Sequence, residues 1–403
     1  MQRNFRWLLT ASGISNLGSK IAREAMQMTA VITLGANPSQ LSWLSVAATL
    51  PVLLLGLFAG AWIDRRRRRR IMIASDILRF AALISVPVAA GLGWLTITQM
   101  IVVVAMVATL SLLFDVADQA LLPALVSSPT LLRANTQREQ IDATTEIAGP
   151  PIGGWLVQVI TAPMALVVDA LSYLVSAALL CCVDHIETQV PRRRPPARQI
   201  CADIALGLRT LWFQPILRPL LIARSLRTFF GAMLGAYYVL YLINRLGVSP
   251  AMLGLIIATG GIASLGGTLL IRWTAAWLPV GPGMILAFSI KTLGLALLPL
   301  AGLLPDWSLP LLIGQQVLQD GVTSYFAVHE RHLRQKLVPA DQLARISAAV
   351  KVANDGPVPL GALVAAGLVP HLGLDGVLWF AVAGYSLSAV VAFCSPLRRL
   401  STV

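Results

Sequence analysis

The amino-acid sequence predicts an all-α integral membrane protein, with twelve transmembrane helices in two pseudo-symmetric six-helix bundles. First, the 403 residues are 57% hydrophobic and only 12% charged, which leaves too little polar surface to cover a soluble globule. Second, continuous apolar runs of about 20 residues recur, long enough to cross a bilayer as helices and unlike the short alternating strands of a membrane barrel. Third, motifs repeat between the two halves.

Hydropathy and turn signals place the spans in order along the chain. The expected ranges are 7–33, 40–63, 71–92, 98–123, 137–160, 164–183, 215–243, 250–272, 282–303, 309–335, 342–369 and 373–394. The longest polar stretch between spans runs from His185 to Gln214 and is rich in proline and arginine. We therefore expect a first bundle over 1–184, a cytoplasmic linker over 185–214 and a second bundle over 215–403.

Basic residues predict the orientation in the membrane. Six consecutive arginines, Arg65 to Arg70, follow Asp64 between the second and third spans. Alternate connections hold most of the other lysines and arginines, with Arg245 as the exception on the opposite side. Because positive loops stay in the cytoplasm, we expect a multi-pass protein of the bacterial inner membrane with both termini cytoplasmic. The net charge of +13 then reflects topology and contact with anionic lipids, and not nucleic-acid binding.

An internal repeat predicts the class of function. Leu125-Val126 followed by Arg133 matches Leu337-Val338 followed by Arg345, and a glycine-proline cluster comes after each copy, at Gly149 and at Gly356. Duplicated six-helix halves are typical of alternating-access transporters, which bind substrate near the bilayer midplane. A signalling or purely structural membrane protein does not need such a duplication.

The segment Gly60-x-x-x-Asp64-Arg65-x-x-Arg68-Arg69 resembles the signature loop of the Major Facilitator Superfamily. The resemblance implies that fold, and a gating role for Gly60, Asp64, Arg65 and Arg68 when the transporter changes its access state. Arg67 stands where that family usually has glycine. Asp115 and Asp118, at the expected end of the fourth span, either accept an arginine of this loop or remain solvated helix-end carboxylates.

Further resemblance narrows the branch of the superfamily. Gly149-Pro150-x-x-Gly153-Gly154 is similar to the glycine-proline motif of its exporters, in which small residues let helices approach closely. Segments over 15–19, 114–123, 333–335 and 395–398 resemble the branch that contains enterobactin exporters and macrolide-efflux permeases. That branch carries siderophores or drugs outward. The chain departs from this branch at Asp118, where arginine is expected, and at the His329-Glu330 pair. It departs from the drug-antiporter pattern of the superfamily in lacking an arginine in the middle of the fourth span.

Ionisable residues at membrane depth are candidates for function. A site formed by Arg23, Arg224 and Arg227 would bind an oxyanion through guanidinium groups, with Glu24 and Asp320 balancing the charge. Glu24, Asp320, Glu146 and Asp355 are the candidates for proton coupling. For each of these residues the alternative is a buried pair that locks helices together. We expect Asp76 with Arg79, and Glu330 with Arg334, to form structural pairs through their helical spacing.

No ATP-binding glycine-rich loop occurs in the sequence, so an ion gradient, by default of protons, must drive transport. Its histidines are scattered and indicate no catalytic, metal or haem site. We therefore expect a monomeric, proton-coupled exporter of a small anionic metabolite such as a siderophore, with lipid contacts and no cofactor. The alternatives are a multidrug or macrolide efflux pump, a lipid or lysophospholipid flippase and, outside transport, a membrane scaffold or enzyme.

Overall fold

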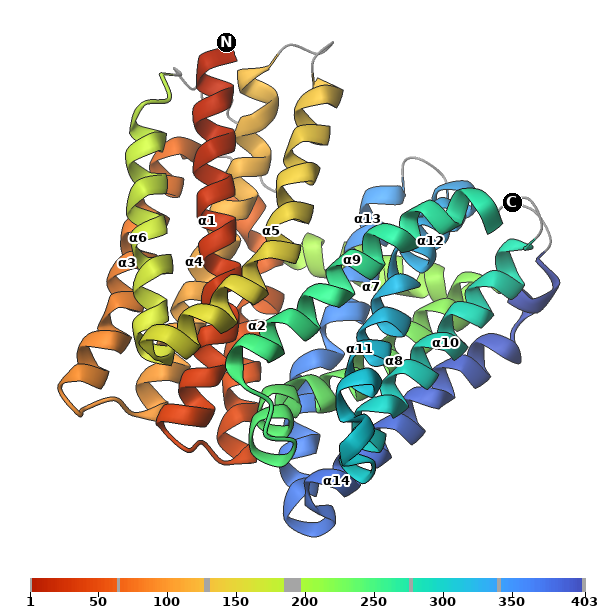
Figure 1. Cartoon of the computed structure of the whole chain (residues 1–403). Helices are drawn as coiled ribbons and strands as arrows, with labels where there is room; N and C mark the ends of the chain where they lie inside the picture. Colours follow the sequence, from red (N-terminus) through yellow and green to blue (C-terminus); the bar gives the residue numbers. More distant parts are fainter. Residues whose placement is uncertain are drawn as a thin grey trace. The chain divides into compact units, whose positions relative to one another are not determined.

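A computed structural model describes residues 2–63, 66–126, 131–184, 197–274, 278–338 and 342–400, which form helices and short connections (Figure 1). No β-strand occurs among these described residues, so the predicted all-α class is confirmed. The chain divides into two compact units. Unit 1 comprises Met1–Arg194 and Ser249–Ala258, and unit 2 comprises Pro195–Val248 and Thr259–Val403.

The helices follow the predicted order. The six spans expected in the first half correspond to α1 (Gln2–Met28), α2 (Pro38–Ile63), α3 (Arg68–Gly91), α4 (Ile97–Leu125), α5 (Leu131–Ile160) and α6 (Ala162–Cys181). The second half contains α7 (Ala197–Phe213), α8 (Leu217–Leu240), α9 (Pro250–Thr274), α10 (Val280–Leu303), α11 (Ser308–Gly321), α12 (Thr323–Leu337), α13 (Leu343–Asp355) and α14 (Pro357–Phe393).

Eight helices within the described ranges are long and apolar enough to cross a membrane. The remaining predicted spans are interrupted or carry polar groups. The tenth span is divided into α11 and α12 at Val322. The eleventh combines α13 with the start of α14, and the twelfth follows a kink in α14 at Gly373, whose φ of 68° is left-handed. The twelve predicted spans therefore all have helical counterparts.

The stretch expected to link the two bundles contains a helix. Residues 197–213 within the expected linker 185–214 form α7, and the place of this linker in the cytoplasm stays a prediction. Leu211 of this helix is buried in the core of unit 2. Its apolar positions recur at helical spacing, a signal that the prolines and arginines just before it obscured.

Local capping explains where several helices begin. At the start of α2, Asn37 Oδ1 accepts the backbone N–H of Gln40, and Gln40 Oε1 accepts the N–H of Asn37, both at 2.9 Å. This reciprocal pair satisfies two donors that a helix start leaves unbonded. At α4, Thr96 Oγ1 accepts the N–H of Gln99 at 3.2 Å. Such local bonds need no tertiary partner, so helix starts are predictable from sequence.

The structure adds a second internal repeat at the ends of α1 and α8. α1 continues into a π-helical turn at Thr29–Thr33, and α8 continues into one at Tyr241–Arg245. In both, the carbonyl of the first π residue accepts the N–H of the leucine that follows the turn. A glycine with positive φ comes next, Gly35 at 59° and Gly247 at 65°. The first and seventh spans are therefore structural counterparts.

Glycine contacts repeat in the same way. A Cβ built at Gly153 in α5 would lie 3.1 Å from the Ile21 carbonyl oxygen of α1. A Cβ at Gly361 in α14 would clash with the Phe229 carbonyl oxygen of α8. Each member of the second pair lies 208 residues after its counterpart in the first. The predicted packing role of Gly153 is consistent with this contact, because only a residue without a side chain lets the backbones approach so closely.

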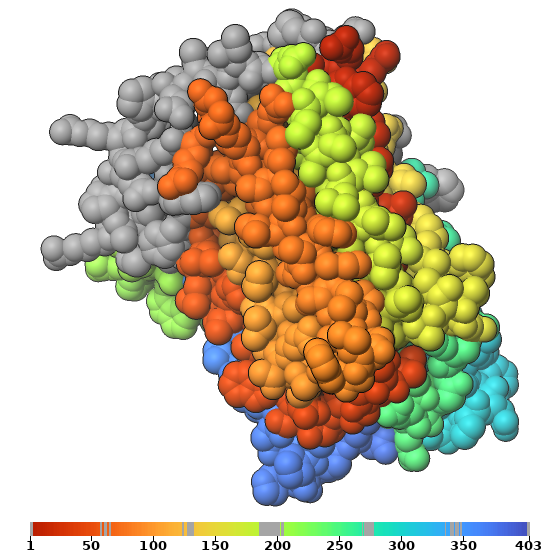
Figure 2. Space-filling model, turned by 90° about the vertical axis from the view of Figure 1, so that its left-hand side faces the viewer, coloured from red at the N-terminus to blue at the C-terminus, as the bar shows by residue number. Residues whose placement is uncertain are grey.

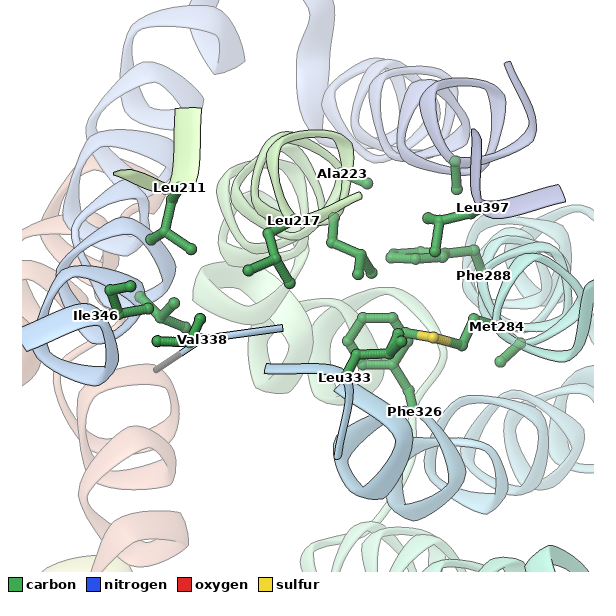
Figure 3. Packing of buried hydrophobic residues seen from close by; sticks show 14 of the residues in the cluster. Leu211, Leu217, Ala223, Met284, Phe288, Phe326, Leu333, Val338, Ile346 and Leu397 are labelled. Atoms are coloured by element: carbon green, nitrogen blue, oxygen red, sulfur yellow. The ribbon is translucent and has the colours of Figure 1, made fainter. Parts of the chain in front are cut away.

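Hydrophobic clusters of described residues lie inside both units. In unit 2, α7, α8, α10, α12 and α13 contribute residues such as Leu211, Leu217 and Ile346 (Figure 3). At its centre the rings of Phe288 and Phe326 meet edge to face, with centroids 4.8 Å apart. Unit 1 has its own cluster, which includes residues of α1, α2, α3, α4 and α6.

One face of unit 1 is apolar. α3 and α6 lie side by side on the face shown in Figure 2. Ile77 and Val88 of α3 and Leu171 and Val175 of α6 are all exposed. Exposed aliphatic side chains along a long apolar helix are suited to contact with lipid tails.

Candidate functional site

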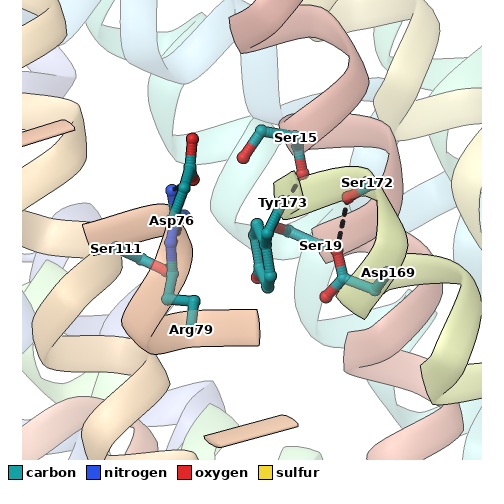
Figure 4. A network of polar contacts seen from close by, with 8 residues as sticks. All are labelled: Ser15, Ser19, Asp76, Arg79, Ser111, Asp169, Ser172 and Tyr173. Atoms are coloured by element: carbon teal, nitrogen blue, oxygen red, sulfur yellow. Dashed lines mark hydrogen bonds and ion pairs between the residues drawn. The ribbon is translucent and has the colours of Figure 1, made fainter. Parts of the chain in front are cut away.

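A deeply buried ion pair of unit 1 lies on α3 (Figure 4). The side chains of Asp76 and Arg79 are 0% and 2% exposed, and they contact each other directly. The Arg79 guanidinium lies between the rings of Phe114 and Tyr173, 4.4 and 4.3 Å from their centroids. The predicted structural pair is therefore confirmed. Because its charge is balanced and covered by aromatic rings, Arg79 has little capacity to bind a substrate anion.

A second polar group joins α5 to α1. Lys20 forms an ion pair with Glu146, and Arg23 Nη1 lies 3.7 Å from the same carboxylate. Asn16 Nδ2 donates to Asp142 at 2.7 Å. Sequence reasoning singled out Glu146 and Arg23 but missed Lys20. The available signal was the spacing of Lys20 and Arg23, three residues apart on one helical face.

The signature loop is described only in part. Asp64 and Arg65 lie outside the described residues, and Gly60 belongs to α2. Arg68 Nη1 donates to the Ala120 carbonyl at 2.8 Å, near the end of α4. Arg69 donates to the carbonyls of Leu180 and Cys181 at 2.8 and 2.5 Å, at the end of α6. These loop arginines therefore bind helix-end carbonyls.

The two carboxylates near the end of α4 have different surroundings. Asp118 is buried and accepts Arg138 Nη2 of α5 at 2.6 Å. Asp115 is exposed. The gating roles proposed for these aspartates remain predictions, but Asp118 has an arginine partner on α5.

An open pocket of about 570 Å³, called the cavity below, lies between α1 and α5. Its lining residues are Leu9, Thr10, Gly13, Ile14, Leu17, Gln137, Gln140, Ile141, Thr144 and Thr145. None of these side chains is charged; half are apolar or glycine, and the others offer amides or hydroxyls. The sequence did not predict this cavity. Its signal in the sequence was the set of uncharged polar residues Gln137, Gln140, Thr144 and Thr145, which recur on α5 among charged ones.

In unit 2, two arginines form cation–π contacts with the same aromatic ring. The guanidinium carbons of Arg224 and Arg227 lie 5.8 and 5.2 Å from the centroid of Phe326. Arg224 also forms an ion pair with Glu330. The expected pairing of Glu330 with Arg334 is therefore wrong. Glu330 is only 9% exposed, so its carboxylate faces the bundle interior, where Arg224 is available.

Lys291 lies beside the break between α11 and α12. It is 6% exposed, and its Nζ donates to Thr323 Oγ1 at 2.6 Å, at the first residue of α12. The carboxylate of Asp320 attracts it and packs against Gly260, where a Cβ would clash. The break in the helix thus brings a buried cation and a carboxylate together.

The four coupling candidates have different environments. Glu24 is 7% exposed and is attracted by Arg23 and Lys20. Asp355 is half exposed and accepts Lys351 Nζ at 2.7 Å, one helical turn away. Arg23 and Glu24 belong to unit 1, whereas Arg224, Arg227 and Asp320 belong to unit 2. A substrate site shared by these residues therefore remains a prediction. The described residues contain no group of three or more His, Cys, Asp or Glu suited to a metal ion.

Comparisons with known proteins define the family. The sequence model of the Major Facilitator Superfamily matches residues 8–356. The chain is 27% identical over 367 residues to the multidrug efflux pump Tap of Mycolicibacterium fortuitum, covering 89% of this chain and 88% of that protein. Among solved structures, a variant of nucleoside transporter NupG gives a TM-score of 0.78 at 12% identity, covering 97% of this chain and 99% of that one.

A bacterial homologue of the iron transporter ferroportin, in its inward-facing state, gives a TM-score of 0.74 at 16% identity, covering 96% of this chain and 98% of that one. At such identities the solved structures establish the fold alone. The family match covers most of the chain. The chain therefore belongs to the Major Facilitator Superfamily and is a multi-pass membrane transporter.

Proposed function

We propose that this transporter exports small amphipathic organic molecules, as a drug efflux pump does. The cavity between α1 and α5 carries the proposal. Its volume of about 570 Å³ falls within the range of about 300–1,000 Å³ typical of small-molecule sites. Its apolar, amide and hydroxyl lining would hold a neutral or weakly polar molecule by dispersion and a few hydrogen bonds, but would not compensate a desolvated oxyanion.

The arginine environments support the same choice. Arg79 is paired with Asp76, and Arg224 is paired with Glu330. A guanidinium that already has a carboxylate partner gains less from a substrate anion than a free one does. The relative Tap is named a multidrug efflux pump, which favours outward transport of drugs. For these reasons we prefer multidrug efflux to siderophore export as the proposed function.

Export of an anionic metabolite such as a siderophore is the second candidate, and Arg227 favours it. Among the described residues no carboxylate lies within ion-pair distance of Arg227, whose guanidinium covers Phe326. An oxyanion could bind such a group bidentately.

We assign the driving force to protons, with Glu24 as the first candidate carrier. Glu24 is a buried carboxylate on the helix that lines the cavity. Asp320 is the second candidate, because a cation lies beside it at a helix break. Glu146 and Asp355 rank lower, since each already has a lysine partner.

Drug susceptibility of an efflux-deficient bacterial host tests the proposed function. Expression of the transporter should raise the inhibitory concentrations of several unrelated amphipathic drugs. Thr10→Trp fills the cavity and should remove this protection. Val102→Trp is the matched control, because Val102 is 53% exposed on α4 and is not a cavity residue. Equal protection by both variants would refute the role of the cavity.

A siderophore-secretion assay distinguishes export of an anionic metabolite from drug efflux. The transporter is expressed in a strain that lacks its own siderophore exporter. If it restores secretion, and Arg227→Gln abolishes that secretion, the anionic-metabolite function replaces drug efflux. Expression and membrane insertion are checked by immunoblotting of each variant. If the transporter changes neither drug susceptibility in the first host nor siderophore secretion in the second, both candidate functions are refuted.

A further inference from the structure

Asp169 of α6 is a fully buried carboxylate in the interior of unit 1, at 0% exposure. Its Oδ1 accepts the Ser172 hydroxyl at 3.0 Å (Figure 4). Its Oδ2 has no hydrogen bond of ordinary geometry among the described residues, although the Tyr173 hydroxyl also interacts with this carboxyl. Buried carboxylate anions normally have partners for both oxygens, so this environment is better suited to a neutral acid.

The charges around Asp169 lead to the same conclusion. The groups that act on it are Arg79 and Asp76 from α3, and Ser172 and Tyr173 from its own helix. Arg79 is the one cation in this set, and it already contacts Asp76. With both aspartates ionised the cluster would carry one uncompensated negative charge. Such a charge in a membrane interior costs several kcal/mol, and one bound proton removes it.

Helix α1 closes the site. A Cβ at Gly18 would clash with Asp169 Oδ1 and Ser172 Oγ, so α1 contacts this part of α6 without an intervening side chain. One residue further on, the Ser19 hydroxyl lies 3.1 Å from the Tyr173 hydroxyl. The same helix contributes Ile14 and Leu17 to the cavity. A displacement of α1 would therefore alter the cavity and uncover Asp169 together.

We propose that Asp169 is a proton-binding site that fills and empties during transport, with α1 as its cover. In the structure described here the carboxyl holds its proton. When α1 moves away, the O–H bond breaks, the proton passes to water, and the remaining carboxylate is attracted to Arg79. The cycling of the proton rests on the proposed proton-driven export. It adds a carrier that is separate from Glu24 and Asp320.

Infrared spectroscopy of the purified, substrate-free transporter tests whether the proton is present. The wild type should show a carboxylic-acid band at neutral pH that is missing in Asp169→Asn. Asp142→Asn is the matched control, because Asp142 is a half-buried carboxylate of the same unit and the band should remain. Identical spectra of wild type and Asp169→Asn would overturn the proposal. If Asp169→Asn does not fold, Asp169→Glu is measured in its place, and a carboxylic-acid band with the wild-type frequency and intensity would overturn the proposal.

Transport measurements test whether the proton cycles. Asparagine reproduces the shape of the protonated acid but cannot release a proton. Uphill drug export by Asp169→Asn in vesicles with an imposed pH gradient should therefore fall at least tenfold, while drug binding stays within about twofold of wild type. Export with the wild-type rate and pH dependence would show a permanent structural proton and overturn the cycling. A wild type that exports no drug would refute the proposed function, whereas the infrared result would still decide whether Asp169 is protonated.

Discussion

Several buried or partly buried arginines of this chain have a carboxylate beside them. Arg79 contacts Asp76, Arg138 contacts Asp118, and Arg224 contacts Glu330. An isolated charge at membrane depth is costly, and a partner lowers that cost. Much of the charge in the interiors therefore holds helices together, and the residues that differ from this pattern, Arg227 and Asp169, are the most informative about function.

Breaking the Asp76–Arg79 pair should destabilise unit 1 strongly. Removing one member of a buried pair leaves an uncompensated charge and costs about 3–5 kcal/mol. We expect Arg79→Leu to lower the thermal unfolding temperature of the purified protein. The double variant with Asp76→Leu should be less destabilised than Arg79→Leu alone, because no lone charge remains. Arg133→Leu is the control, since Arg133 is exposed. A double variant less stable than Arg79→Leu would contradict this account.

Amide substitutions should separate the coupling candidates. A carboxylate that must bind and release a proton cannot be replaced by its amide. Glu24→Gln should abolish gradient-driven export and retain drug binding, and Asp320→Asn should reduce export. Asp355→Asn should behave as wild type, because Asp355 pairs with Lys351 near the surface. The measurement is uphill transport in vesicles beside equilibrium binding. Uphill export by Glu24→Gln, Glu146→Gln, Asp320→Asn and Asp355→Asn alike would exclude these four residues as carriers.

Pairings between distant residues explain why sequence reasoning located charged residues but not all of their partners. Asp76 and Arg79 share a helical face, so their pairing follows from spacing alone. Arg224 and Glu330 come from different helices, and their contact depends on how α8 and α12 pack. The same limitation hid the partner of Glu146 and the cavity between α1 and α5. Side-chain partners across helices are tertiary information, which hydropathy and motifs do not contain.

At the scale of helices, glycines determine how closely two elements approach. α5 contacts α1 at Gly153, and α14 contacts α8 at Gly361. The sequence motif indicated that close packing occurs near 149–154, but it did not identify the partner helix. The break between α11 and α12 also escaped prediction, because Gly321 and Val322 do not by themselves interrupt an apolar span. Helix starts with local caps, by contrast, were predictable.

Larger side chains at the two glycines should therefore be disruptive. Gly153→Leu would push α5 away from α1, and Gly361→Leu would push α14 away from α8. Overpacking typically costs about 1–3 kcal/mol, so both variants should unfold at lower temperature and show reduced export. Gly235→Leu is the matched control, because a Cβ there would meet no atom within 4 Å. Stability equal to wild type in Gly153→Leu would mean that this contact is not tight.

For the whole molecule, the fold class was predictable because long apolar spans and alternating basic loops do not depend on tertiary detail. Contacts within unit 1 are consistent with helices that alternate in direction across the membrane. Asn4 Nδ2 donates to the Asp184 carbonyl at 2.5 Å, and Arg69 donates to the Leu180 carbonyl at 2.8 Å. The starts of α1 and α3 and the end of α6 therefore lie at one end of the unit, which also carries the arginine-rich loop.

The orientation of that end in the membrane can be tested by cysteine labelling. Because positive loops remain in the cytoplasm, single cysteines at Arg67 and Asp184 should be inaccessible to a membrane-impermeant maleimide in intact cells and should react after permeabilisation. Cysteines at Trp94 and Asp306, which are exposed in connections of the opposite set, should react without permeabilisation. The background lacks the native cysteines, because Cys181, Cys182 and Cys394 are exposed and would react themselves. Labelling of the Arg67 position from outside, with Trp94 protected, would reverse the predicted orientation.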